Sequence, residues 1–153
     1  MYLALKTIYD PTTPQDNIII VRSAVPSQDI GFLPGSYIEK LAPYEEPYDS
    51  ICDFLFKIHN VYDSLKDHGF LTFMPFSFIR GITFDRAVIV VDECQNANFH
   101  MLDSVITRCG EDTRIIFSGD YNQSDLAKKS DMDGVLKFME VLSKLEHFTH
   151  VEF

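Results

Sequence analysis

Three short segments are almost purely apolar and rich in β-branched residues, and they constrain the fold more than any other feature. They are NIIIVR (Asn17–Arg22), AVIVVD (Ala87–Asp92) and RIIFSGD (Arg114–Asp120). A strand with one face in water alternates apolar and polar side chains, and these segments do not alternate. They therefore predict strands that are buried on both faces, as in a parallel sheet covered by helices on each side.

Segments with the helical spacing of apolar residues lie between and after these strands. Residues 2–10 (YLALKTIYD) look like the tail of an amphipathic helix, and residues 48–69 show apolar residues three and four apart, closed by a glycine. Residues 96–110 predict another helix, with Asn98 as its N-cap, and residues 134–145 predict a last one. Strands that alternate with helices indicate an α/β domain.

Shorter segments complete the predicted order of elements. We expect a strand at residues 71–75, a turn or short helix at 76–81, a polar loop at 121–133, and a final strand at 148–153. Residues 23–36 contain two prolines and two glycines, which predicts irregular structure. The whole chain, residues 1–153, has the length of one domain.

Composition excludes several classes of protein. The three cysteines, Cys52, Cys94 and Cys109, are an odd number without metal-finger spacing, which favours reduced thiols in a cytoplasmic chain. His147 and His150 form a spaced pair with no third ligand nearby in the sequence. No apolar run approaches the roughly 20 residues of a membrane span. The net charge of −10 works against autonomous nucleic-acid binding.

Acidic residues follow two of the predicted strands at the point where each strand ends. Asp92 and Glu93 close the second run, and Gly119 and Asp120 close the third, with Gln123 just after. Ligands of open α/β sheets gather outside the carboxyl ends of the strands. An aspartate there suits Mg²⁺ held through water, and a neighbouring glutamate suits a base that orients an attacking water. Either motif alone is equally typical of a solvated strand end or a turn, but together they predict a nucleoside-triphosphate site.

The two motifs, VIVVDECQN and RIIFSGDYNQSDL, resemble those of the PhoH-like family of P-loop ATPases, which are related to the first motor domain of superfamily-one helicases. The family's DEAQN stands here as residues 92–96, with Cys94 in place of alanine, and its TGDxxQxDL has Ser118 in place of threonine. GFLPG at Gly31–Gly35, FIRGITF and TRCG fit the same pattern, so the resemblance covers essentially the whole chain. It implies a three-layer, mainly parallel sheet of the P-loop NTPase (RecA-like) type.

The resemblance also implies roles for individual residues in a site for ATP and Mg²⁺. Asp92 would hold Mg²⁺ through its water shell, the helicase-type Walker B role, and Glu93 would polarise the hydrolytic water. Asp120 and Gln123 would sense the γ-phosphate. These assignments make Glu93 and Gln123 catalytic and Asp92 the metal-binding residue.

Other residues of the same motifs are candidates with an alternative structural role. Gln95 and Gly119 would contribute to nucleotide binding. Arg80 and Arg108 would position phosphate or reach a neighbouring subunit as an arginine finger, because the family tends to form rings. Of the two, Arg80 is a candidate for binding the nucleotide, and Arg108 is a third candidate catalytic residue. A residue such as Arg108 near a helix C-terminus can equally serve to complement the helix dipole. For Cys94 we favour the role of a small core residue.

One expected feature is absent from the sequence. A phosphate loop reads GxxxxGK[ST] and opens a helix, and no such string occurs among the 153 residues. YLALKTI is what the family shows directly after that signature. We therefore expect a chain without the first strand and phosphate loop, in which two remaining strands lose a shared neighbour. Such a chain would bind ATP weakly or not at all alone, or would need a partner chain that supplies the loop.

Three hypotheses follow for the function. The leading one is an N-terminally truncated PhoH-like ATPase domain that acts on or near RNA, where the RNA part rests on the resemblance alone. The second is a non-catalytic interaction module derived from such an ATPase. The third is a metal-dependent nuclease or phosphatase that uses Asp92, Glu93 and Asp120 as direct metal ligands.

Overall fold

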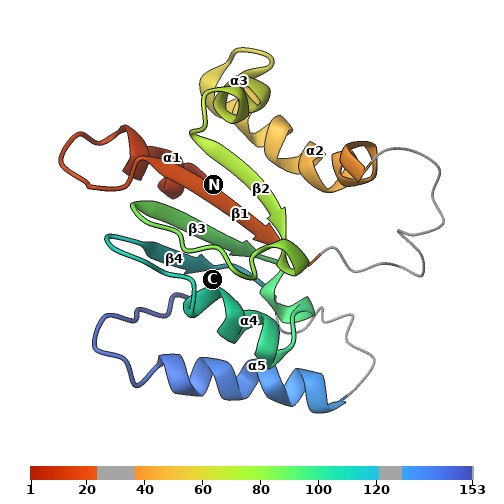
Figure 1. The fold of residues 1–153 in the computed structure, drawn as a ribbon, viewed down its shortest axis with the longest axis vertical. Coiled ribbons are helices and arrows are strands. Elements are labelled where there is room, and N and C mark those ends of the chain that lie inside the picture. The colour runs from red at the N-terminus through yellow and green to blue at the C-terminus, as the bar shows by residue number, and fades with distance from the viewer. Residues whose placement is uncertain (24–36, 121–128, 153) are drawn as a thin grey trace.

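Four parallel strands form one sheet in the order β2-β1-β3-β4, with helices on both of its faces (Figure 1). The computed structural model describes residues 1–23, 37–120 and 129–152, and only the backbone of residues 37–40 and 129–133. The strands are β1 (Asn17–Arg22), β2 (Leu71–Pro75), β3 (Ala87–Asp92) and β4 (Arg114–Phe117). This arrangement confirms the predicted α/β fold with a parallel sheet.

The two central strands, β1 and β3, are buried on both faces as the unbroken apolar runs predict. They pair in register from Asn17 opposite Ala87 to Arg22 opposite Asp92, so both strands end at the same edge of the sheet. We call this edge, where β1 and β3 end, the carboxyl edge. Successive side chains of each strand point to opposite faces, which gives the domain two separate apolar cores.

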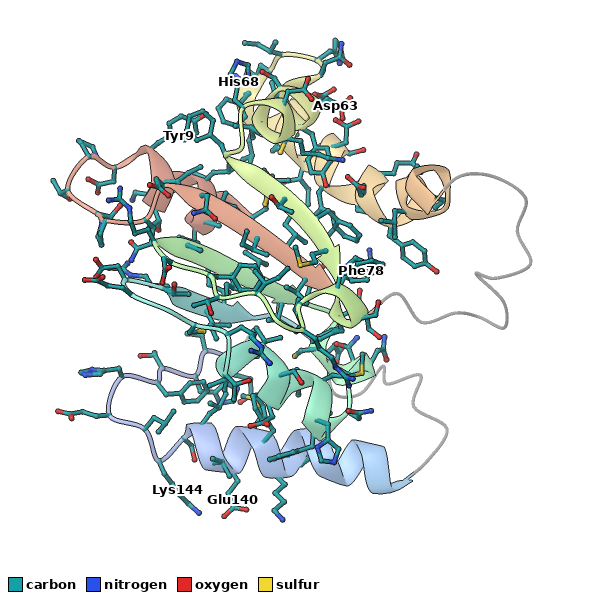
Figure 2. All side chains as sticks on the ribbon, in the orientation of Figure 1. Tyr9, Asp63, His68, Phe78, Glu140 and Lys144 are labelled. Carbon is teal, nitrogen blue, oxygen red and sulfur yellow. The ribbon has the colours of Figure 1, made fainter. Side chains whose placement is uncertain are left out.

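One core lies between the sheet and the helices α4 (Phe99–Ile106) and α5 (Lys129–Leu142). α4 begins as predicted at Asn98, whose side chain accepts a hydrogen bond from the backbone nitrogen of Met101. Every second residue of β1 and β3 faces this core: Ile19, Val21, Ala87, Ile89 and Val91. The buried residues of the two helices pack on them: Leu102, Val105, Val135, Phe138 and Leu142. Glu140 on α5 and Lys144, just beyond the end of this helix, form an ion pair on the outer surface (Figure 2).

The opposite core lies under the helices α1 (Tyr2–Tyr9), α2 (Tyr37–Phe56) and α3 (Val61–Asp67). These helices bury the alternate residues of the same strands, including Ile18, Ile20, Val88 and Val90. α1 confirms the helix expected at the start of the sequence. α2 runs from the side of the carboxyl edge back toward α3 and the start of β2 (Figure 1), and its Tyr48 meets the end of β3.

The helix predicted for residues 48–69 is wrong in its bounds. The observed helix α2 begins at Tyr37, upstream of the expected start, and contains Pro43 and Pro47, although proline is unfavourable in a helix interior. It then stops at Phe56, because the backbone turns through positive φ at Lys57 (56°) and Asn60 (63°) before α3 begins. The glycine expected at the end, Gly69, does follow α3 with φ of 77°.

Other predicted segments had mixed outcomes. β2 has the predicted bounds, and a short 3₁₀ helix, η1 (Phe76–Phe78), occupies the expected turn. The loop predicted for residues 121–133 is wrong at its end, because α5 begins at Lys129, and residues 121–128 lie outside the described residues. Residues 148–152 form no strand, contrary to expectation. The irregular segment predicted at 23–36 lies outside the described residues apart from its first residue.

β4 differs from the buried strand that its sequence predicted. It ends at Phe117, and its residues are exposed or half-buried because β3 is its one neighbour within the described parts of the sheet. Each of the four described strands is hydrogen-bonded to the next one in the order β2-β1-β3-β4, so this part of the sheet has no gap. None of these four strands is separated from its neighbour by a missing strand, and β4 lies at an edge of the sheet, so the expectation that two strands lose a shared neighbour stays a prediction.

Among the residues that the structure describes, no helix combines the length and apolar composition required to cross a membrane.

Candidate functional site

The two acidic motifs meet at the carboxyl edge, as the sequence predicted. The backbone nitrogen of Ser118 donates to the oxygen of Val91 (2.9 Å), and the nitrogen of Cys94 donates to the oxygen of Ser118 (3.0 Å). The segment after β4 thereby continues alongside the loop after β3, which forms the short 3₁₀ helix η2 (Cys94–Asn96). Two motifs more than twenty residues apart in sequence thus form one surface.

Gln95 is the side chain that joins the two motif loops. It is only 4% exposed, and its Oε1 accepts a hydrogen bond from the backbone nitrogen of Asp120 (3.2 Å). Its Nε2 donates to the Oε2 atom of Glu93. One buried amide therefore connects the glutamate that follows β3 with the aspartate that follows β4.

Gly119 is required at its position because the loops approach so closely. A Cβ atom there would lie 2.4 Å from Oε1 of Gln95 and 2.8 Å from Sγ of Cys94. Both distances are shorter than any normal contact, so a larger residue would separate the two loops. Cys94 itself is buried in the core, which confirms its interpretation as a small core residue, and burial raises the pKa of its thiol to about 11.

We expect Gly119→Ala to lower the free energy of unfolding by about 1–3 kcal/mol, since the new methyl group has no space between the loops. Urea denaturation of the variant measures the change. Gly134→Ala is the matched control, because the nearest atom to its Cβ would be 3.4 Å away and alanine favours the helix interior. Equal effects of the two substitutions would contradict the close approach at Gly119.

The adjacent acids Asp92 and Glu93 are held by different partners. Oδ2 of Asp92 accepts a hydrogen bond of 2.6 Å from the hydroxyl of Tyr48 on α2. Glu93 has a left-handed backbone (φ 52°), an unusual conformation for a residue other than glycine, and its Oε1 lies 3.7 Å from Nη2 of Arg22 at the end of β1. The turn at Glu93 thus directs the two carboxylates to separate neighbours.

The donor set at the carboxyl edge fits a hydrated Mg²⁺ better than a protein-bound metal cluster. Mg²⁺ prefers carboxylate oxygens and commonly keeps several waters, with one or two carboxylates and the substrate phosphates as its other ligands. Over the described ranges there is no group of three or more His, Cys, Asp and Glu side chains arranged to hold a metal. Asp92, Glu93 and Asp120 therefore do not form the direct three-ligand set of the nuclease hypothesis.

Comparison with known proteins now identifies the family. The model of the PhoH family, described as PhoH-like protein, matches residues 2–153. The chain belongs to the PhoH-like family. This result confirms the resemblance on which the sequence interpretation rested.

Curated relatives support the same assignment. Protein PhoH of Escherichia coli K12 is 37% identical over 115 residues, which cover 74% of this chain and 32% of that protein. The PhoH-like protein of Bacillus subtilis is 34% identical over 137 residues, which cover 88% of this chain and 42% of that protein. Protein PhoH2 of Mycolicibacterium smegmatis is 31% identical over 141 residues, which cover 90% of this chain and 32% of that protein. The chain thus spans between about a third and two fifths of the length of these curated relatives.

The structure does not bring Arg108 to the acidic motifs. The backbone oxygen of Arg108 accepts a hydrogen bond from the nitrogen of Phe84, just before β3, so the residue lies at the amino-terminal edge of the sheet. It follows the last turn of α4, the position of a cation that complements a helix dipole. A role in a neighbouring subunit's site stays a prediction for Arg108.

The two remaining predicted site residues are Arg80 and Gln123, of which the structure describes Arg80 alone. Arg80 follows η1, which begins at the carboxyl end of β2, and Phe78 of the same element lies at that end of the sheet (Figure 2). Gln123 lies outside the described residues. The roles of both Arg80 and Gln123 in binding the nucleotide stay predictions.

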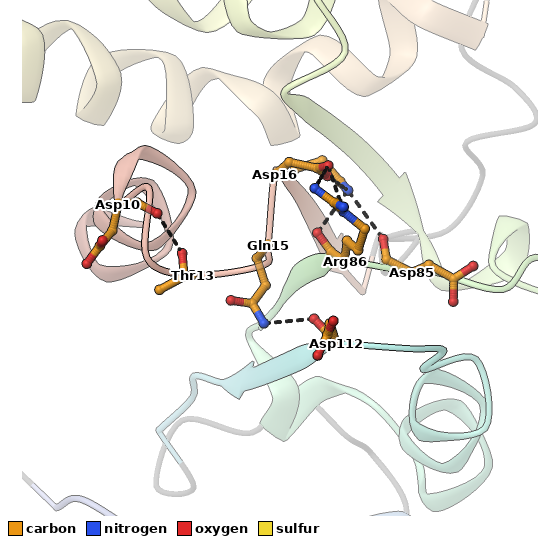
Figure 3. A network of polar contacts seen from close by, with 8 residues as sticks. Asp10, Thr13, Gln15, Asp16, Asp85, Arg86 and Asp112 are labelled. Carbon is orange, nitrogen blue, oxygen red and sulfur yellow. Dashed lines mark hydrogen bonds and ion pairs between the residues drawn. The ribbon is translucent and has the colours of Figure 1, made fainter.

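A second polar network lies at the opposite, amino-terminal edge of the sheet and has a structural role (Figure 3). Nη2 of Arg86 is 2.9 Å from Oδ2 of Asp16, and Nε2 of Gln15 donates to the backbone oxygen of Asp112 (2.8 Å). These contacts tie the loops that precede β1, β3 and β4 to one another. They lie at the starts of the strands, away from the acids at the carboxyl edge.

Sequence reasoning missed two residues that contact the acids, Arg22 and Tyr48. Arg22 was assigned only as the end of a strand, although a charged residue after an apolar run is the same signal that marked Asp92. Tyr48 was assigned only as the start of a helix, and no local pattern marks it. Its contact with Asp92 depends on how α2 crosses the sheet.

Proposed function

We propose that this part of the PhoH-like protein binds ATP together with Mg²⁺ at the carboxyl edge of the sheet and takes part in its hydrolysis. The observation that supports this most directly is the hydrogen-bonded contact between the two motif loops through Gln95, Glu93 and Asp120. Open α/β sheets bind their ligands outside the carboxyl ends of the strands, and acids at that edge suit the metal that accompanies a phosphorylated ligand.

The roles follow from the chemistry of each side chain. Bound Mg²⁺ would neutralise charge on the phosphate oxygens. Tyr48 donates a hydrogen bond to Oδ2 of Asp92. The other carboxylate oxygen of Asp92 would accept hydrogen bonds from the water shell of the metal. Glu93 would orient the attacking water and accept its proton. Gln123 and Asp120 would register the γ-phosphate and pass its presence to Gln95 across the loop contact.

Contacts to the phosphates need groups that these motifs do not supply. No GxxxxGK[ST] string occurs in the 153 residues, and two carboxylates cannot bind the negative β- and γ-phosphates directly. We assign the phosphate cradle to residues other than these 153, in the same polypeptide or in a partner. The oligomeric ring that the family resemblance implies is one way in which such a partner would be present.

RNA binding by these residues alone is disfavoured by their charge. The net charge of −10 opposes association with a phosphate backbone, which needs a basic footprint. We therefore confine the proposal to the nucleotide.

Titration of the whole protein as it is expressed, with a fluorescent ATP analogue, tests the proposal. We expect binding that depends on Mg²⁺ and that weakens in Asp92→Asn, because the amide lacks the charge that holds the hydrated metal. Asp103→Asn is the control, since this aspartate is exposed on α4, away from the motifs. Absence of nucleotide binding in the unmodified protein, or equal binding by the two variants, would overturn the proposal.

A further inference from the structure

Tyr48 is buried against the acid that we assign to the metal. The residue is 4% exposed, and its ring lies beside that of Phe73 on β2, with the centroids 5.9 Å apart. Its hydroxyl donates to Oδ2 of Asp92 at 2.6 Å. A hydrogen bond to a charged acceptor is among the stronger kinds in proteins, and here the donor is carried on a ring that packing holds in place.

The hydroxyl of Tyr48 can only act as the donor in this pair. A phenol hydroxyl carries a hydrogen at neutral pH, whereas a carboxylate has only acceptor oxygens. Because a carboxylate has two oxygens, the bond commits one of them and leaves the other to a ligand.

The two acids are consequently divided between two supports. Tyr48 holds Asp92 from α2, whereas Arg22 at the end of β1 lies beside Glu93. In the proposed site, this division would assign Asp92 to the hydrated metal and Glu93 to the attacking water.

We propose that Tyr48 is a positioning residue for Asp92, which holds this carboxylate in the orientation that a hydrated Mg²⁺ requires and connects α2 to the metal site. The inference rests on the proposed function for the identity of the metal. Groups that orient a metal-binding side chain commonly alter metal affinity about 10–100-fold when they are removed.

The chain offers a matched control in Tyr62. This tyrosine is 2% exposed, and its hydroxyl donates to a carboxylate oxygen of Glu45 (2.8 Å), between α3 and α2. Tyr48→Phe and Tyr62→Phe each remove one buried hydroxyl that is bonded to a carboxylate. They differ in which carboxylate loses its donor, so a purely structural effect would appear in both.

The experiment measures Mn²⁺ binding by electron paramagnetic resonance in the whole protein as it is expressed, with and without ATP. We expect Tyr48→Phe to raise the dissociation constant for Mn²⁺ about tenfold, and Tyr62→Phe to leave it unchanged. Urea denaturation of both variants shows that they are folded. An unchanged constant in Tyr48→Phe, or an equal rise in both variants, would overturn the positioning role.

The same measurements separate this inference from the proposed function. If the unmodified protein binds Mn²⁺ and ATP but Tyr48→Phe binds them equally well, only the positioning role fails. If the unmodified protein binds Mn²⁺ but no ATP, the proposed function fails, and a weaker constant in Tyr48→Phe still supports the positioning role. If the unmodified protein binds neither ligand, both are overturned.

Discussion

Glu93→Gln is expected to lower the rate of ATP hydrolysis by about 10²–10⁴-fold while nucleotide binding changes little. Glutamine has the same shape as glutamate, but its amide cannot accept the proton of the attacking water. The weakened contact with Arg22 matters less, because it spans 3.7 Å between partly exposed groups. Single-turnover hydrolysis and titration with an ATP analogue measure the two quantities separately in the whole protein.

Glu111→Gln serves as the control for this experiment. Glu111 is exposed, and its backbone oxygen accepts from the nitrogen of Arg86 at the amino-terminal edge, so its substitution should leave both quantities unchanged. A hydrolysis rate in Glu93→Gln equal to that of the unmodified protein would exclude Glu93 as the catalytic base. A large loss of Mn²⁺ affinity in the same variant would instead indicate that Glu93 is a direct metal ligand.

Ile89→Ala is expected to lower the free energy of unfolding by about 2–5 kcal/mol. Ile89 is 0% exposed and lies in the middle of β3, where it is opposite Ile19 of β1 and Ile115 of β4. Its removal leaves a cavity in the core beneath α4 and α5, and the paired strands on both sides limit how far that core can collapse. Urea denaturation monitored by circular dichroism measures the loss.

Ile58→Ala is the matched control for the core substitution. Ile58 is 64% exposed between α2 and α3, so truncation there should change stability by less than about 0.5 kcal/mol. A loss at Ile89 as small as the loss at Ile58 would contradict the double burial of β3. Nucleotide binding should survive in any Ile89→Ala protein that remains folded, since Ile89 is buried in the core and is not one of the residues assigned to the site.

The strands were the part of the fold most readily predicted from sequence. β1, β2 and β3 have the predicted bounds. For β1 and β3 the reason is that a run of β-branched apolar residues has few alternatives to a buried strand. β4 was overpredicted, since its apolar sequence did not reveal that β3 is its one described neighbour. Whether a strand is central or at an edge depends on the order of strands, which local sequence does not contain.

The helices were less predictable because packing overrides local preference. Pro43 and Pro47 favour irregular structure, but α2 includes both and buries Tyr48 and Cys52 against the sheet. The break after Phe56 occurs at Lys57 and Asn60, which both have positive φ angles. A lysine rarely adopts such an angle, so no feature of the sequence predicted the break at Lys57. Burial of one helix face outweighs these local costs.

The sequence by itself determined the buried strands, their alternation with helices, which indicates a parallel sheet, and the acids that follow two of the strands, because each is a pattern of residues close together in the chain. Only the tertiary structure decided what holds those acids. Tyr48 reaches Asp92 across 44 positions, and Arg22 reaches Glu93 from a different strand. Such contacts follow from strand register and from the way a helix crosses the sheet, which are set by the packing of the whole core.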